Sequence, residues 1–267
     1  MRDVKRFPVV RLDEKHQKDI EDEVVVEEPL EVRVNGESIS VVMRTPGNDF
    51  DLTTGLLLTE GIIHSCDEIG TIAYCPDETD LELKNVVNVR LLDAKRKLKS
   101  SRWSWSSSSC GLCGKATLDA IHQHCKPITS AATASYDVVC SLPIRLRQAQ
   151  SNFDRTGGIH AAALFDLKGR LLVLREDIGR HNAADKVLGA SLREKLALDK
   201  TIMMVSGRLG FEIAQKALVA GIPIVASISA PSSLALDLAN DFQMTTIGFL
   251  RGRSMNVYTH PERVSAG

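Results

Sequence analysis

The sequence predicts an α/β protein, α+β overall, in which a small N-terminal α+β domain precedes a three-layer α/β/α domain. Three observations predict it: β-rich runs and one helix pattern fill residues 24–92, a serine-rich stretch interrupts them at 95–109, and helices alternate with short β runs from Ser141 onward. The chain of 267 residues, 43% of them apolar, is long enough to bury two cores. We expect a tail at 1–22, the small domain at 23–130 and the α/β/α domain at 131–267.

The small domain is expected to begin with a tight hairpin. Two β-rich runs within residues 24–43 flank Asn35-Gly36, and Asn-Gly between such runs favours a type I′ turn. Asn48 can then cap a helix that ends near Gly61 and covers the hairpin. Two further strands are expected at 69–74 and 81–92.

The second domain is expected to alternate helices with strands. A helix begins at Pro143, a hairpin turns at Lys168-Gly169, and another helix begins near Asn182. The remaining elements are expected as a strand at 201–205, a helix at 209–220, a strand at 222–228, a helix at 232–240, and strands at 245–250 and 255–259. Such an order is typical of a sheet between two layers of helices.

Composition narrows the class of protein. The formal net charge of -1 provides no bulk attraction to nucleic acid or to an anionic membrane. Residues 1–20 lack the apolar run of a secretory signal, and apolar runs such as 222–228 are far shorter than the roughly 20 residues of a membrane helix. We therefore expect a cytoplasmic protein. In that reducing compartment a close pair among the six cysteines indicates metal, redox or nucleophile chemistry.

Cys110 and Cys113 form that close pair. They precede a helix expected at 115–125, and a helix N-terminus stabilises a thiolate, so a cysteine there is a candidate nucleophile. The alternatives are half of a structural zinc site or two buried thiols. No second close pair is present to complete four zinc ligands, and a serine run stands where a thioredoxin-like enzyme has a strand. Both the zinc and the thioredoxin interpretations are therefore weakened.

Two loops of the second domain combine groups that bind phosphate. Ser206, Gly207 and Arg208 fall between an expected strand and helix, where backbone N–H groups, a hydroxyl and a guanidinium can hold an anion. The second loop sets two arginines around a glycine at a strand end, and these repel unless an anion or carboxylates lie between them. Its residues are Phe249, Leu250, Arg251, Gly252, Arg253 and Ser254.

Other polar residues near expected helix starts have two interpretations. Asn182 can be a plain N-cap while Arg180 and His181 face the ligand. The loop at 229–233 can bind phosphate or supply a serine N-cap. His160 enters a β run, where a lone histidine is more often a satisfied core residue than a catalyst.

Together these segments resemble the FdhD family, the formate dehydrogenase accessory sulfurtransferases. The resemblance covers about residues 23–263. It rests on the motifs Arg44-Thr-Pro-Gly-Asn-Asp49, Thr59-Glu-Gly61, Cys110-Gly-Leu-Cys-Gly114, Gly157-Gly-Ile-His160, Asp177-Ile-Gly-Arg-His-Asn-Ala183, Ser206-Gly-Arg208 and Val257-Tyr-Thr-His260.

The resemblance implies a function. The family takes sulfur as a persulfide from a cysteine desulfurase and passes it to the molybdenum or tungsten bis(molybdopterin guanine dinucleotide) cofactor of formate dehydrogenase. Carried over, Cys110 is the persulfide carrier, Cys113 its partner, and 249–254 a cofactor-binding stretch. The cofactor is then a bound substrate, and the family implies a homodimer. Cys113 can share the sulfur or expel it by forming a disulfide.

The family also resembles the cytidine deaminases in its second domain, and the expected element order suits that fold. Deaminase chemistry is not expected, because it requires His-X-Glu followed by Pro-Cys-X-X-Cys. Ala162 occupies the glutamate position, the Cys110 pair precedes His160, and no cysteine follows Cys140. We therefore expect no catalytic zinc.

Two other functions stay open. The chain can be a cofactor-binding chaperone for formate dehydrogenase in which the cysteines bind zinc or a partner and no sulfur moves. It can also be a general thiol oxidoreductase, which would turn over small disulfides without any cofactor.

Overall fold

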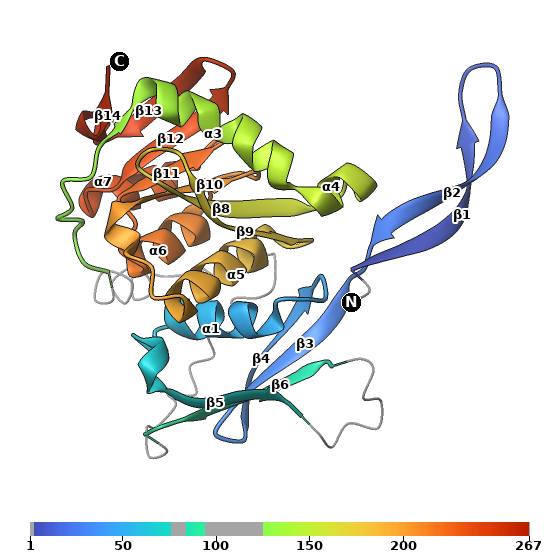
Figure 1. Cartoon of the computed structure of the whole chain (residues 1–267), viewed down its shortest axis with the longest axis horizontal. Helices are drawn as coiled ribbons and strands as arrows, with labels where there is room; N and C mark the ends of the chain where they lie inside the picture. The colour runs from blue at the N-terminus through green and yellow to red at the C-terminus, as the bar shows by residue number, and fades with distance from the viewer. Residues whose placement is uncertain (1–2, 76–83, 94–124, 267) are drawn as a thin grey trace.

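Figure 1 shows the chain as a computed structural model that describes residues 3–75, 84–93 and 125–266. The small sheet has four strands in the order β4-β3-β6-β5, which are β3 (Glu28–Val34), β4 (Glu37–Arg44), β5 (Ile69–Tyr74) and β6 (Val86–Leu91). Asn35 and Gly36 both have positive φ, which confirms the predicted turn. The linker at 95–109, the cysteine pair and nearly all of the helix expected at 115–125 lie outside the described residues.

Helix α1 (Asp49–Thr59) covers the small sheet, as predicted. Its leucines, Leu52, Leu56 and Leu57, pack on inward-facing strand residues such as Val32. The predicted cap is wrong in its chemistry: Asn48 adopts a left-handed conformation with φ 55, and its side chain makes no capping hydrogen bond. The carboxylates of the first turn provide the negative charge that this helix end favours.

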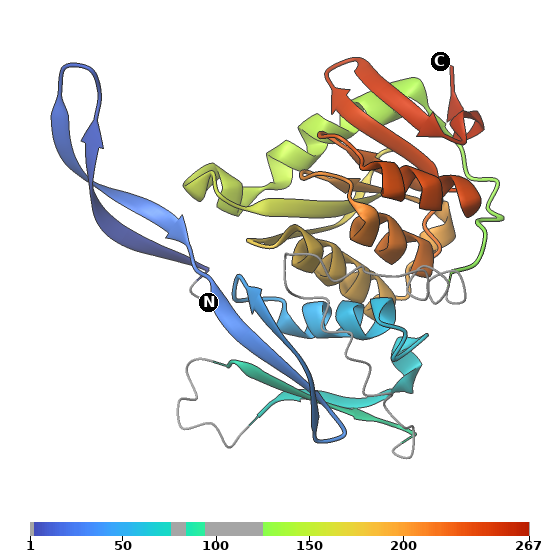
Figure 2. The same ribbon diagram turned by 180° about the vertical axis from the view of Figure 1, so that it is seen from behind.

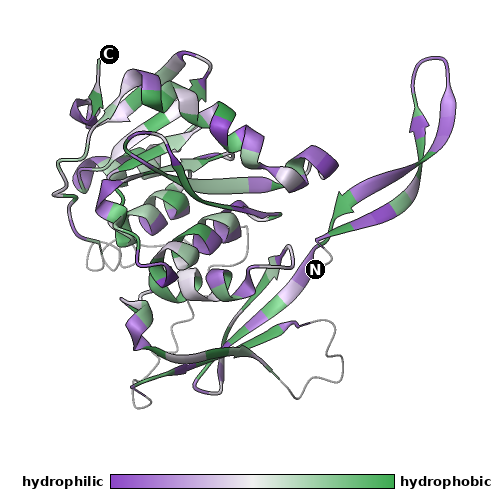
Figure 3. Ribbon diagram, viewed as in Figure 1, coloured by the Kyte–Doolittle hydropathy of each residue, from purple (hydrophilic) through white to green (hydrophobic). Residues whose placement is uncertain are grey.

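The segment before the small sheet is a hairpin where a tail was expected. Strands β1 (Val4–Leu12) and β2 (Gln17–Val25) pair antiparallel and project as an arm away from both sheets (Figures 1 and 2). Apolar and polar residues are mixed along both strands (Figure 3) but do not alternate strictly, since Val9 and Val10 are adjacent in β1, so the period-2 pattern that predicts a strand is absent. Arg155 anchors the arm to the body through a 2.9 Å contact with Glu23.

The second domain contains a six-stranded sheet in the order β13-β12-β11-β10-β8-β9. Its strands are β8 (His160–Asp166), β9 (Leu171–Asp177), β10 (Thr201–Val205), β11 (Ile224–Ser227), β12 (Thr245–Arg251) and β13 (Ser254–Thr259). Strands β10, β11 and β12 are parallel, while β8, β9 and β13 are joined antiparallel. Every strand predicted for this domain is present.

Helices cover both faces of this sheet, which gives the predicted three layers (Figures 1 and 2). On one face lie α5 (Arg180–Arg193), α6 (Phe211–Val219) and α7 (Ser233–Asp241), and on the other lies α3 (Tyr136–Ala149). The shorter elements are η1 (Cys66–Glu68), β7 (Ala134–Ser135), α4 (Ser151–Thr156), η2 (Leu198–Lys200), η3 (Pro261–Arg263) and β14 (Val264–Ser265). The division into domains at residue 130 stays a prediction.

The predicted start of the first helix in this domain, at Pro143, is wrong. Helix α3 begins at Tyr136, and the Ser135 hydroxyl accepts the Val138 N–H as an N-cap. Pro143 therefore lies inside the helix, where it removes one backbone hydrogen bond. Burial of Val139, Leu142 and Leu146 against the sheet compensates for that loss.

The two domains meet where α1 crosses α5. A Cβ atom added to Gly55 would lie 1.9 Å from the carbonyl oxygen of Asp185, and one added to Gly189 would lie 1.9 Å from that of Asp51. The backbones of the two helices are thus in direct contact, and only glycine permits this approach.

Replacing Gly189 with alanine is expected to lower the free energy of unfolding by about 2 kcal/mol, because overpacking outweighs alanine's better helix propensity. Urea unfolding measures the change. Gly158→Ala is the control, since a Cβ there meets only Thr156 O, at an ordinary contact distance of 3.7 Å. Equal unfolding midpoints for the two variants would contradict the predicted contact.

Candidate functional site

Three of the predicted segments meet at one edge of the six-stranded sheet. β10 ends there, β8 begins there, and β9 runs there into α5. The Ser206 N–H donates to Ala161 O at 2.9 Å, so the loop after β10 lies beside the start of β8. Loops at the carboxyl ends of parallel strands are common ligand sites. This edge therefore collects residues that lie far apart in the sequence.

Gly207 is the centre of this edge. A Cβ added to Gly207 would lie 3.2 Å from His160 Nδ1 and 3.6 Å from Arg180 Cβ. The Gly207 carbonyl accepts a hydrogen bond from the Ser227 hydroxyl at 2.7 Å, which fixes the loop to β11. The missing side chain lets the imidazole and the first turn of α5 approach the same backbone. The structure therefore brings together Gly207, Arg180 and His160.

Ser206 and Arg208 lie on either side of Gly207. Their side chains differ in how many hydrogen-bonding groups remain available for a ligand. The Ser206 hydroxyl oxygen accepts the Ala161 N–H at 2.9 Å, so only its hydrogen remains for another acceptor. The side chain of Arg208 is exposed. Among the residues that the structure describes, neither Arg208 nor Arg180 has an ion-pair partner. Two guanidinium groups therefore remain available to an anion.

Helix α5 begins without a side-chain cap, contrary to the N-cap interpretation of Asn182. Its N-cap is Gly179, and the Asn182 amide instead donates to Met43 O at 2.7 Å and to Asp177 Oδ1 at 3.0 Å. The Asn182 amide donates to these acceptors because its side chain faces the small domain. The N-cap of α6, Gly210, also has no capping side chain. Ser232, in contrast, caps α7 and accepts the Ala235 N–H.

The histidines of the edge differ in their partners. His181 Nε2 lies 2.7 Å from a carboxylate oxygen of Glu212, and this hydrogen bond lowers the pKa of Glu212. Burial lowers the pKa of His160, and the nearby charges of Arg180 and His181 lower it further. His160 is therefore neutral near pH 7, and the arginines carry most of the positive charge. The sequence prediction missed Glu212, although an acid in the first turn of an expected helix was a visible signal.

The two arginines of the loop at 249–254 have different partners in the structure. Arg251 Nε donates to Ile228 O at 3.2 Å, beside the loop after β11. Arg253 forms an ion pair with Asp137 at 2.8 Å and stacks over the Tyr136 ring. The exposed Phe249 has a φ of 51, which is unusual for a bulky side chain. Of the two explanations for the close arginines, an anion or carboxylates, the structure provides a carboxylate for Arg253.

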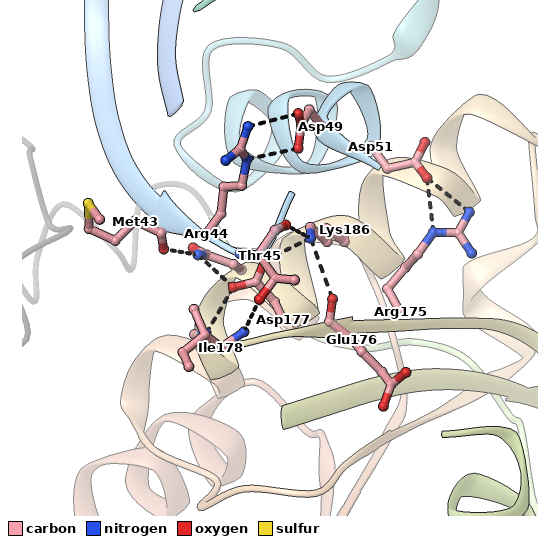
Figure 4. A network of polar contacts seen from close by, with 12 residues as sticks. Met43, Arg44, Thr45, Asp49, Asp51, Arg175, Glu176, Asp177, Ile178 and Lys186 are labelled. Carbon is pink, nitrogen blue, oxygen red and sulfur yellow. Dashed lines mark hydrogen bonds and ion pairs between the residues drawn. The ribbon is translucent and has the colours of Figure 1, made fainter. Parts of the chain in front are cut away.

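Residues from two motifs of the resemblance form polar contacts between the small domain and the start of α5 (Figure 4). Asp177 is fully buried, accepts the Thr45 N–H at 3.1 Å, and also lies 2.7 Å from Lys186 Nζ. Arg44, also fully buried, pairs with Asp49 at 3.1 Å. The motifs at 44–49 and 177–183 thus join the small domain to α5.

The described part of the chain gives no support for a metal site or for a helix that spans a membrane. None of its histidine, cysteine, aspartate and glutamate side chains gather in a group of three that can hold a metal ion. Its helices include none with the length and apolar character needed to cross a membrane. Cys110 and Cys113 lie outside the described residues, so their predicted roles stay predictions.

The fold and this edge define an α+β protein with a cationic strand-end site. The FdhD/NarQ family model matches residues 25–265, and the chain belongs to this family. It is 48% identical over 252 residues to the sulfur carrier protein FdhD of Streptomyces avermitilis, which covers 91% of this chain and 89% of the relative. The same-named protein of Sulfolobus acidocaldarius is 43% identical and covers 98% of both chains.

A solved structure has the same fold. The crystal structure of a protein assigned as a formate dehydrogenase accessory protein from Desulfotalea psychrophila superposes with a TM-score of 0.80. It is 25% identical and covers 98% of this chain and 99% of that one. The match therefore extends over both domains and the arm.

Proposed function

We propose that this protein is a sulfur carrier that takes sulfur from a cysteine desulfurase and transfers it to the molybdenum or tungsten bis(molybdopterin guanine dinucleotide) cofactor of formate dehydrogenase. The observation that carries the proposal is the 48% identity, over 91% of the chain, to a protein named as a sulfur carrier. The cationic edge supports the second half of it, because a dinucleotide cofactor presents phosphates that bind arginines and helix N-termini. The proposal includes formate dehydrogenase as client and a homodimer as assembly.

The chemistry begins at Cys110. Its thiolate attacks the outer sulfur of the desulfurase persulfide, a new S–S bond forms at Cys110, and the desulfurase cysteine leaves with the electron pair as a thiolate. In the second step the Cys113 thiolate attacks Cys110 Sγ and forms a disulfide. The outer sulfur departs with the electron pair as sulfide and goes to the metal. A cellular thiol must then reduce the disulfide.

The phosphates of the cofactor bind at the strand-end edge. Arg208 and Arg180 supply guanidinium groups, and the uncapped N-terminus of α5 supplies backbone N–H groups. Arg251 extends the site toward β12, while Arg253 joins it by exchanging Asp137 for a phosphate. Binding places the metal within reach of the sulfur and so supplies proximity.

Intact mass spectrometry tests the sulfur transfer. Incubation with desulfurase and cysteine is expected to add one sulfur atom to each chain, and addition of the metal cofactor is expected to remove it. A chain that binds the cofactor but never gains sulfur would instead be a chaperone. Turnover of small disulfides without any cofactor would favour the oxidoreductase.

Nucleotide titration tests the phosphate site. Arg208→Ala is expected to weaken the binding of GDP about tenfold or more, because a charge-assisted hydrogen bond contributes roughly 1.5 to 3 kcal/mol. Arg251→Ala is expected to weaken it similarly. Arg170→Ala, at an exposed pair with Asp166 in the turn between β8 and β9, is the control and should not change affinity. Equal affinities for Arg208→Ala and Arg170→Ala would remove Arg208 from the site.

A further inference from the structure

The sequence left the role of His160, at the cationic edge, open. It is half-buried, which fits a core histidine, but a core histidine normally has its ring nitrogens hydrogen-bonded. In the part of the chain that the structure describes, neither nitrogen of His160 has a hydrogen-bond partner. The described part of the chain therefore leaves both ring nitrogens of His160 available to a ligand.

The position of the ring points to a ligand. A Cβ added to Gly207 would lie 3.2 Å from His160 Nδ1 and 3.6 Å from the Cβ of Arg180, so both residues lie against the loop that carries Arg208. The imidazole of His160 and the Cβ of Arg180 thus both pack against Gly207, and the charge of Arg180 is near enough to lower the pKa of His160. The residue after Gly207, Arg208, has no ion-pair partner among the described residues. An anion bound by the arginines would lie beside the imidazole.

The charges around His160 come from each neighbouring element. Arg180 and His181 on α5 repel a proton on the imidazole, and Asp177 on β9 attracts one. Asp177 is already occupied by Lys186, and Glu212 on α6 by His181. A phosphate bound between the arginines would add negative charge where the free protein has an excess of positive charge.

We propose that His160 binds a phosphate group of the nucleotide directly, neutral in the free protein and protonated in the complex. The proposal rests on the proposed function, since it takes a nucleotide phosphate as the ligand. Binding then takes up a proton from solvent, and affinity rises as the pH falls. The sign follows because the ligand stabilises the protonated form, so the pKa of His160 is higher in the complex than in the free protein.

Calorimetric titration with GDP in buffers of different ionisation enthalpy measures the proton uptake. The wild-type protein is expected to take up a fraction of a proton near pH 7 and to bind GDP more tightly at about pH 6 than at about pH 8. His160→Gln is expected to abolish both the uptake and the pH dependence, and to weaken binding about tenfold. His16→Gln, on the exposed arm, is the control and should leave all three unchanged.

The outcomes separate this proposal from the proposed function. If Arg208→Ala weakens binding but His160→Gln does not, the role of His160 is overturned and the phosphate site stands. Proton uptake that survives in His160→Gln and disappears in His181→Gln would also overturn it. A wild-type protein that binds no GDP overturns both. If His160→Gln does not fold, the imidazole NMR signal of the wild-type protein decides, because GDP must raise the pKa of His160.

Discussion

Replacing Asp177 with alanine is expected to lower the free energy of unfolding by about 3–5 kcal/mol, because it leaves the charge of Lys186 buried and unpaired. Lys186 is 1% exposed and its Nζ lies 2.7 Å from Asp177 Oδ2. The Thr45 N–H and the Gly179 N–H lose their acceptor as well. Urea unfolding followed by circular dichroism measures the loss.

Asp67→Ala provides the matched control for Asp177→Ala. Asp67 and Lys195 are 3.0 Å apart but 71% exposed on both sides, so solvent screens this pair and its loss is expected to change stability little. The double variant Asp177→Leu with Lys186→Met is expected to recover most of the lost stability, because it leaves no buried charge. If Asp177→Ala and Asp67→Ala lose equal stability, the interface pair is not the element that holds the domains together.

Cys110→Ala is expected to abolish sulfur loading completely, because no other thiol replaces the nucleophile of the first step. Cys113→Ala is expected to load sulfur and retain it, since the disulfide that expels it cannot form. Intact mass after incubation with desulfurase and cysteine distinguishes the three proteins. Cys66→Ala is the control: its thiol donates to Leu192 O at 3.3 Å and is expected to play no part. Normal loading of Cys110→Ala would exclude the carrier mechanism.

The strands could be predicted from the sequence where the pattern of apolar residues reflects which side chains are buried. The bounds of β5 and β10 agree with the prediction to the residue, because β10 is buried throughout and β5 alternates in burial from Thr71 to Tyr74. The arm of β1 and β2 was missed because its apolar residues, such as Phe7 and Val10, remain exposed and follow no face. Backbone pairing and exposed charged contacts such as Arg6 with Glu23 join these strands, and a search for apolar patterns does not detect either.

Helix starts were less predictable, because whether a residue acts as an N-cap depends on which other groups its side chain can reach. Asn182 has the residue type of an N-cap, but its amide bonds to Met43 O, 139 residues away in the sequence. Pro143 has the residue type of a helix start, but α3 already begins at Tyr136, with Ser135 as its N-cap. At Asn182 a tertiary contact outweighs the local preference, whereas at α3 the local hydrogen bond from the Val138 N–H to the Ser135 hydroxyl begins the helix before Pro143.

The site was predictable in its residues and not in its pairings. Ser206, Gly207 and Arg208 follow a strand, which is where ligand loops occur, and the structure places them at the edge with Arg180. That Arg253 pairs with Asp137, and His181 with Glu212, depends on how α3 and α6 pack. The separation of these residues along the chain does not predict that they lie close together in space.

The contact of backbone on backbone between α1 and α5 excludes a hinge between the two sheets. Rotation about Gly55 and Gly189 would drive carbonyl oxygens into neighbouring main-chain atoms, and separation would expose the Asp177 charge pair to water. A clamshell closure over the cofactor is therefore ruled out for this pair of helices. For the same reason, a truncated chain that begins after the small sheet would present one bare side of α5 to solvent, and we expect it to aggregate when expressed alone.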